Sequence, residues 1–217
     1  MSGSQRKQAI GDAQEREKNS AALAEIATFL EKQGWQYCLI GGLAASYWGQ
    51  PRSTKDVDLV LLTGIGDEER FIKPLTAAFP VRVAGADKFA LVSRVVLLQT
   101  KAGVGIDVSL GALPFEEEML RRAKIKEVLP GVRVRTATAE DIVVMKSIAG
   151  RPRDVDDIER IIATQGKNLD AEYIRRWLTD FSEALSETDL VGFFESTVKN
   201  VEDRMKKTPR GKLPRGG

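Results

Sequence analysis

The chain has 217 residues, of which 42% are hydrophobic and 29% charged, so wholesale disorder is excluded. The net charge is only +2 and by itself indicates no partner. The sequence contains no histidine, which excludes Ser-His-Asp and Cys-His catalysis and removes the commonest transition-metal ligand. Any metal must therefore bind oxygen, and carboxylates favour Mg²⁺ or Mn²⁺.

Targeting signals are absent from the sequence. No apolar run approaches the length that crosses a bilayer, and residues 1–20 lack the apolar stretch of a signal peptide. We therefore expect a cytoplasmic protein with no membrane partner. The single cysteine, Cys38, lies in an apolar run and is expected to be buried and inert.

The length suits one catalytic-sized domain with a small appendage. We expect a flexible N-terminus at residues 1–19, a main domain at 20–165, a C-terminal helical segment at 166–203 and a basic flexible tail at 204–217. The tail is either a solubilising segment or a contact for phosphate backbones. Its cations are Arg204, Lys206, Lys207, Arg210, Lys212 and Arg215.

In the first half of the chain, apolar periodicity and glycines predict alternating helices and strands. The expected order is a helix from about Ser20 to Gly34, a strand at 37–40, a helix at 43–48, a strand at 56–62 and a helix at 67–79. Pro74 would kink or split the last of these helices.

The second half begins with two β-rich runs, 89–100 and 104–110, which the hairpin signal Lys101-Ala102-Gly103 separates. Helical patterns dominate thereafter. The expected elements are a helix at 114–124, a strand at 132–135, a helix from Thr138 to Gly150, a helix from Pro152, and two amphipathic helices after Asn168.

Three acids stand in the expected strands. Asp56 and Asp58 are two residues apart, so their side chains project to the same face. Asp107 lies between Ile106 and Val108, where a carboxylate is expensive to bury without a partner. The three would repel one another unless a divalent cation neutralised them, and two Mg²⁺ ions would activate an attacking oxygen and stabilise a leaving pyrophosphate. By itself, Asp-x-Asp is more simply a solvated strand end.

Phosphate-binding features precede these acids. Gly41 and Gly42 lie between a strand and a helix, where backbone N–H groups form an anion site, although a glycine pair alone is more often a tight turn. Arg52 and Thr54 lie in the loop before Asp56, within reach of phosphate, although Arg52 is equally well explained as a surface cation.

The order of these motifs resembles the DNA polymerase β-type nucleotidyltransferase superfamily. Its parts are Gly41-Gly42, then Arg52-x-Thr54-x-Asp56-x-Asp58-Leu59, then Ile106-Asp107-Val108. A later stretch, from Glu140 through Lys146 to Arg151-Pro152-Arg153-Asp154-Val155-Asp156-Asp157-Ile158, is similar to AbiEii-type toxin nucleotidyltransferases and related bacterial proteins. The resemblance covers about residues 35–165. It implies an α+β nucleotidyltransferase fold, in which helices flank a mixed β-sheet, with a C-terminal helical extension.

The resemblance also implies roles for single residues. Gly41 and Gly42 would cradle phosphate, and the acids Asp56, Asp58 and Asp107 would bind Mg²⁺ or Mn²⁺. One departure is that Gly42 stands where AbiEii-like members often have Ser or Thr, which removes a hydroxyl contact to phosphate.

Lys146 would contact the triphosphate, although a lysine near a helix end also complements the helix dipole. An acid after Arg151 would act near the nucleophile or order Lys146. Helical geometry ranks Asp154 first and Asp157 second, and places Asp156 toward solvent.

These residues predict a metal-dependent nucleotidyltransferase that moves a nucleoside monophosphate from a nucleoside triphosphate to a hydroxyl. The acceptor would be an RNA end, such as that of tRNA, or a protein side chain. One form of this hypothesis is the toxin of a toxin–antitoxin pair, with an antitoxin partner. The alternative is a catalytically silent nucleotide- or RNA-binding module, or an inhibitory partner. A metal-dependent phosphohydrolase is disfavoured because this sequence lacks the histidines that the metal sites of such enzymes usually use.

Overall fold

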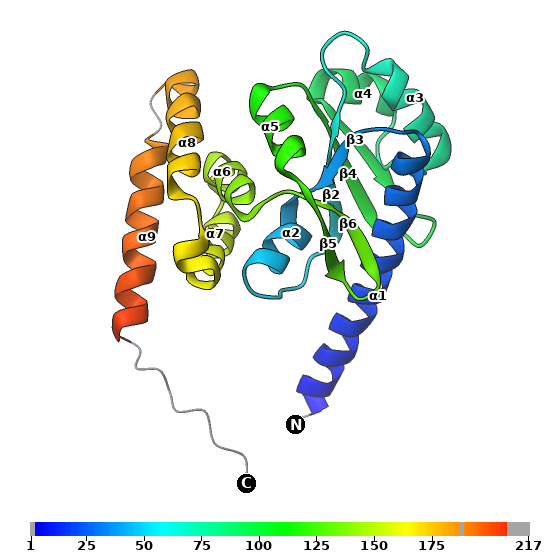
Figure 1. Cartoon of the computed structure of the whole chain (residues 1–217). Helices are drawn as coiled ribbons and strands as arrows, with labels where there is room; N and C mark the ends of the chain where they lie inside the picture. Colours follow the sequence, from blue (N-terminus) through cyan, green and yellow to red (C-terminus); the bar gives the residue numbers. More distant parts are fainter. Residues whose placement is uncertain (1–2, 187–188, 208–217) are drawn as a thin grey trace. The chain divides into compact units, whose positions relative to one another are not determined.

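A computed structural model describes residues 3–186 and 189–207 of the chain (Figure 1). It forms two compact units, one of Met1–Tyr47 with Pro51–Thr138 and the other of Trp48–Gln50 with Ala139–Gly217. The expected main domain, residues 20–165, therefore has parts in both units. No helix in the described ranges has both the length and the hydrophobicity needed to cross a membrane.

The first unit is built on a six-stranded mixed sheet with the order β3-β4-β2-β1-β6-β5. Its strands are β1 (Tyr37–Leu39), β2 (Asp56–Leu62), β3 (Val95–Gln99), β4 (Gly105–Gly111), β5 (Lys124–Leu129) and β6 (Val132–Thr136). The central strand β2 pairs in parallel with β4 and antiparallel with β1. β1 pairs in parallel with β6, and the two outer strands run antiparallel to their neighbours. The mixed sheet of the expected α+β fold is confirmed.

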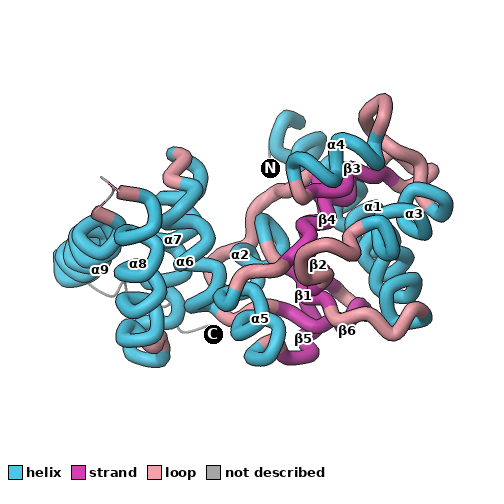
Figure 2. The backbone as a smooth tube through the Cα atoms, turned by 90° about the horizontal axis from the view of Figure 1, so that it is seen from above, coloured by secondary structure: helices cyan, strands magenta, loops and turns pink. Residues whose placement is uncertain are grey.

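Helices cover both faces of this sheet, as Figure 2 shows, with α1 and α3 on one side and α2 and α5 on the other. The helices of the first unit are α1 (Gly3–Lys32), α2 (Gly41–Trp48), α3 (Glu69–Ala78), α4 (Ala86–Ser93) and α5 (Pro114–Arg122). The apolar face expected for α1 is buried, since Leu23, Ile26 and Leu30 are inaccessible to solvent. Cys38 in β1 is also buried, as predicted.

The second unit is helical in its described part. Its helices are α6 (Ala139–Ala149), α7 (Pro152–Gln165), the short 3₁₀ helix η1 (Gly166–Asn168), α8 (Ala171–Leu185) and α9 (Leu190–Lys207). The predicted helix from Pro152 is present as α7 and buries Ile158, Ile161 and Ile162, whereas Val155 is half-buried. Trp48–Gln50 belongs to this unit, and Gln165 Nε2 of α7 donates to the Trp48 carbonyl at 2.6 Å.

Two helix predictions at the ends of the chain were wrong. α1 begins at Gly3, so Ser20 lies inside the helix and does not cap it. The residues before Ser20 are rich in Gln, Ala, Glu, Lys and Arg, which favour helix and carry it back past a possible cap. At the other end, Arg204, Lys206 and Lys207 belong to α9 and not to a tail, and Arg204 pairs with Glu159 of α7. The remaining tail cations, Arg210, Lys212 and Arg215, lie outside the described residues.

The β-rich run predicted at 89–100 was wrong in its first half. Residues 89–93 belong to α4, which ends where Arg94 adopts a left-handed conformation (φ 55°), and β3 begins only at Val95. The sequence suggested a strand because Phe89, Leu91 and Val92 are apolar, yet all three are exposed on the helix. The turn at residues 101–103 does join two antiparallel strands, β3 and β4, as predicted. Pro74 lies inside α3 without splitting it.

Candidate active site

Three carboxylates lie on one face of the sheet where β2 begins. Asp56 and Asp58 alternate with the buried Val57 along β2, and Asp58 pairs with Asp107 across the parallel strand β4. Neighbours in a parallel pair project to the same face, so all three acids share it. Asp107 is not buried as the sequence suggested, because 32% of its side chain is exposed.

Asp58 packs against the glycine pair at the start of α2. The Gly42 N–H donates to Asp58 Oδ2 at 3.3 Å. Gly41 has a φ of +64°, and a Cβ there would lie 2.5 Å from Asp58 Cβ and still closer to its carboxylate. Two requirements thus select glycine at this position: the left-handed backbone and the close approach of an acid. In this structure the anion at the helix N-terminus is the carboxylate of Asp58.

Asp56 has a matching arrangement on its other side. It pairs with Gly105 of β4, and a Cβ on Gly105 would clash with Asp56 Oδ1. The same point lies 3.3 Å from Arg82 Nη1. Among the described residues, Asp56 makes no ion pair, and it keeps open space only because position 105 has no side chain.

Arg82 is a member of this site that the sequence did not predict. Its guanidinium Nη2 forms an ion pair and hydrogen bond with Asp107 Oδ1. Arg82 lies between α3 and α4, 25 residues before Asp107, and no motif links the two positions. Only the pairing of its loop with the edge of the sheet brings them together.

The three acids fit a divalent cation by the type of their donor atoms. Their donors are carboxylate oxygens, which suit Mg²⁺ or Mn²⁺, and they lie on adjacent strands with glycines beside them. In their present conformations the side chains are not arranged to coordinate an ion, since no group of three acids or cysteines within the described residues could hold one. Asp58 is turned toward Gly42 and Asp107 toward Arg82.

The loop before β2 runs along the start of α2. A Cβ on Gly42 would lie 2.5 Å from Thr54 Oγ1 and 3.4 Å from Arg52 Nη2, so this loop carries a hydroxyl and a cation to the helix N-terminus. Asn19 of α1 anchors the loop by donating from Nδ2 to the Thr54 carbonyl at 2.6 Å. The sequence singled out Arg52 and Thr54 but missed Asn19. This side chain is buried, and it precedes Thr54 by 35 residues in the sequence.

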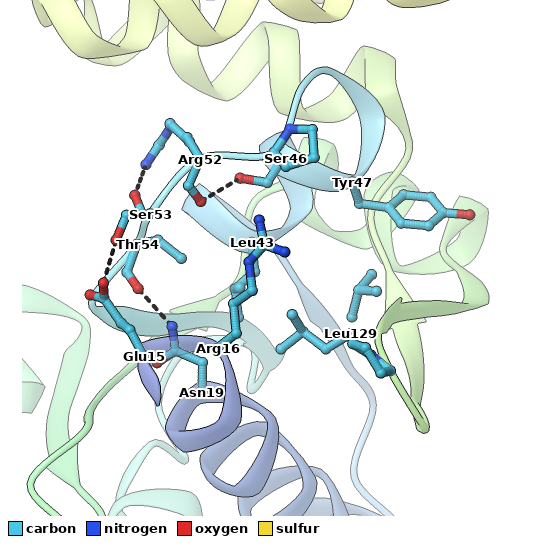
Figure 3. A pocket seen from close by; sticks show the side chains of 13 residues that line it. Glu15, Arg16, Asn19, Leu43, Ser46, Tyr47, Arg52, Ser53, Thr54 and Leu129 are labelled. Carbon is cyan, nitrogen blue, oxygen red and sulfur yellow. Dashed lines mark hydrogen bonds between the residues drawn. The ribbon is translucent and has the colours of Figure 1, made fainter. Parts of the chain in front are cut away.

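The same loop forms one wall of a cavity of about 250 Å³ in the first unit (Figure 3). Leu43 and Tyr47 of α2, Leu129 of β5 and Arg16 of α1 line it from the other sides. Ser53 is held at its edge by a hydrogen bond to Glu15. Helix α2 and the loop before β2 therefore border the cavity and also contain or contact the glycine pair.

The second unit contains a separate buried charge cluster. Lys146 Nζ of α6 lies 2.8 Å from Asp154 Oδ1 and 2.7 Å from Asp157 Oδ2, both on α7. Arg151 Nε donates to the other Asp154 oxygen at 2.6 Å. Two cations thus face two carboxylates, which compensates the charges that α6 and α7 bury.

Position along α7 distinguishes its three acids. Asp154 and Asp157 are buried, whereas Asp156 is exposed. Burial raises the pKa of Asp154, but hydrogen bonds from Arg151 and Lys146 outweigh it and leave that pKa below its usual value. The structure therefore brings Lys146, Asp154 and Asp157 together.

Comparison with solved structures shows the fold. The solution structure of the antibiotic-resistance factor ANT(2'')-Ia matches with a TM-score of 0.51 and 13% identity, over 88% of this chain and 98% of that one. An antigenic nucleotidyltransferase-like protein from Paracoccidioides brasiliensis matches with a TM-score of 0.48 and 16% identity, over 82% and 93% of the two chains. The likeness to ANT(2'')-Ia shows a shared fold, and together with the family match below it confirms the expected nucleotidyltransferase fold.

A family comparison goes further than the fold. Residues 20–206 match the family described as "Nucleotidyltransferase of unknown function" (DUF6036). Because this match covers most of the chain, the protein belongs to that family. No curated protein matches the sequence.

Proposed function

We propose that the protein transfers a nucleoside monophosphate from a nucleoside triphosphate to a hydroxyl group, with release of pyrophosphate. The observation that carries this proposal is the placement of Asp56, Asp58 and Asp107 on one face of β2 and β4, beside the N-terminus of α2. Membership of a nucleotidyltransferase family supports the same reaction.

In this proposal the three acids hold Mg²⁺ or Mn²⁺, which would neutralise phosphate charge and activate the attacking hydroxyl when bound. The chain supplies the binding groups. Gly42 N–H and the side chains of Arg52 and Thr54 lie together at the start of α2 and would donate to phosphate oxygens. The N–H becomes available once Asp58, its present partner, turns away toward the other acids.

Lys146 is proposed as a further contact to the triphosphate. Asp154 and Asp157 would then orient its ammonium group, because both lie within 2.8 Å of Nζ. Ion pairs to two buried acids restrict the rotamers of Lys146, which favours a fixed donor over a mobile surface cation.

The acceptor is proposed to be an RNA end, such as that of tRNA, or a protein side chain, within the cytoplasm. The similarity of residues 140–158 to AbiEii-type proteins supports a toxin with an antitoxin partner as the specific form of this activity. The toxin hypothesis has an additional testable consequence: expression of the protein without its antitoxin should slow the growth of the cells.

The test uses nucleoside triphosphates labelled at either phosphate. The full chain is incubated with Mg²⁺, total RNA and cell protein, and each of the four triphosphates carrying label at the α or the γ position. We expect α-label to become macromolecule-bound and γ-label to leave as pyrophosphate. Nuclease and protease digestion then identify the acceptor. Transfer of γ-label would show a kinase and contradict the proposal.

A second function deserves a test because of one observation. Asp58 and Asp107 already have partners in Gly42 and Arg82, an arrangement that a silent nucleotide- or RNA-binding module would also tolerate. Such a module would bind triphosphate or RNA in an equilibrium assay and transfer no label under any of the conditions above.

A further inference from the structure

We propose that Arg82 is the resident cation of the acid site, which compensates the carboxylates in the metal-free protein and competes with the divalent ion for them. Arg82 would thus set the metal affinity of the site. The inference rests on the proposed function, because it requires these acids to be a metal site.

The backbone holds Arg82 in place. Its N–H donates to the Leu97 carbonyl at 3.0 Å, and Leu97 is the residue of β3 that pairs with Asp107. On either side of Arg82, the loop is tied to the same strand: Val81 bridges Leu98, and the Gln99 N–H donates to the Pro80 carbonyl at 2.8 Å. The loop therefore forms a short extra edge on the sheet, next to the acids.

The guanidinium lies beside two of the three acids. One nitrogen, Nη2, pairs with Asp107, and the other, Nη1, lies 3.3 Å from the point where a Cβ on Gly105 would also clash with Asp56. The third acid, Asp58, is held by the Gly42 N–H. One positive side chain thus occupies the side of the cluster between Asp107 and Asp56.

Arg82 and a divalent cation cannot both hold Asp107 in this way. A bound ion needs the Asp107 oxygens as ligands and brings two positive charges next to the guanidinium, which repel it. The ion pair can open, because the side chains of Arg82 and Asp107 are 29% and 32% exposed and water can solvate both groups. Metal binding therefore includes the cost of breaking this pair.

The experiment measures Mn²⁺ binding to the full chain by electron paramagnetic resonance, without nucleotide. We expect Arg82→Gln to bind Mn²⁺ about fivefold more tightly than the wild type, since a partly exposed ion pair is removed from the competition. Arg82→Lys keeps the charge and should stay close to the wild type. The matched control is Arg70→Gln, which removes an exposed cation of α3 that lies 3.8 Å from Asp67 and should leave the affinity unchanged.

Each outcome decides between the inference and the function on which it rests. Mn²⁺ binding by the wild type that Arg82→Gln fails to tighten, or weakens, overturns the role of Arg82 and leaves the proposed function standing. An equal gain in Mn²⁺ affinity in Arg70→Gln would show that the loss of any nearby positive charge has this effect, and would also overturn the role of Arg82. No Mn²⁺ binding by any variant, all shown to be folded by circular dichroism, overturns both the metal site and the inference.

Discussion

At the scale of single residues, the three acids differ in what surrounds them. Asp58 accepts from a helix N–H, Asp107 pairs with a guanidinium, and Asp56 has no ion-pair partner among the described residues. Repulsion among the three acids alone would let an Asp-to-Asn change at any of them preserve or raise the stability of the metal-free protein. Arg82 changes that expectation at one position.

The first prediction compares two of these positions. Asp56→Asn should hold or raise the free energy of unfolding without metal, because it removes a carboxylate that forms no ion pair within the described residues, and so breaks none. Asp107→Asn should lower it by up to about 1 kcal/mol, since Arg82 loses its partner and the pair is partly exposed. Urea unfolding in the presence of a chelator measures both. A marked loss of stability in Asp56→Asn would show that this acid has a structural role.

The second prediction concerns Gly41. Gly41→Ala should lower the free energy of unfolding by about 3 kcal/mol, because it combines a left-handed backbone with a clash against Asp58. Gly34→Ala is the matched control, since Gly34 has a φ of +68° but open space around it, and should cost only about 1 kcal/mol. Equal losses would mean that Asp58 does not select glycine at position 41.

The residue-scale features that the sequence predicted are local ones. Asp56 and Asp58 could be placed on one face because strand periodicity fixes it, and Gly41 and Gly42 because they separate a strand from a helix. Arg82 and Asn19 could not be found, because each reaches its partner only through tertiary packing across 25 and 35 residues. Neither carries a pattern that distinguishes it from a surface residue.

At the scale of elements, α7 illustrates how the position of an acid around a helix determines whether it is buried or exposed. The apolar stripe of α7 places Asp154 and Asp157 with the buried residues and Asp156 with the exposed ones. Helical periodicity correctly predicted that Asp156 faces solvent. It placed Asp157 farther from the buried face of the helix than the structure does. The reason is Lys146, whose ammonium group draws both carboxylates inward.

The third prediction follows from this cluster. Asp154→Asn should cost about 3 kcal/mol of unfolding free energy at pH 7, because it breaks a buried pair, whereas the exposed Asp156→Asn should change it by less than about 0.5 kcal/mol. Thermal or urea unfolding measures both variants.

The pH dependence of the same variants has a definite sign. The pKa of Asp154 is lower in the folded chain than in the unfolded one, so its stabilisation is present above the unfolded value and lost as the pH falls toward the folded value. Asp154→Asn should therefore lose stability less steeply than the wild type below about pH 4. Parallel curves for the two proteins would contradict the assigned pairing.

Element boundaries failed where the local signal was ambiguous. Residues 89–93 are apolar enough for a strand, yet the chain forms α4 and leaves Val92 88% exposed. A short apolar run does not distinguish the two structures by period alone. Here the left-handed residues Gly85 and Arg94, which flank the helix, determine its bounds, and only glycine at position 85 hints at this in the sequence.

At the scale of the whole molecule, the residues that the sequence singled out are divided between the two compact units. The acids, the glycine pair and Arg52 belong to the first unit, and Lys146 with Asp154 belongs to the second. The order of motifs predicted the fold through its resemblance to a known superfamily: the glycine pair opens α2, and the three acids lie on β2 and β4. It could not predict the boundary near residue 138, which depends on contacts between elements.

The most direct test of the account is the rate of nucleoside monophosphate transfer by single-acid variants. Asp56→Asn, Asp58→Asn and Asp107→Asn should each lower the rate at least about 100-fold, because each removes a ligand charge from the metal site. The exposed Asp87→Asn in α4 is the matched control and should keep the wild-type rate. Wild-type transfer rates in Asp58→Asn or Asp107→Asn, with the fold intact, would contradict the assignment of these acids to catalysis.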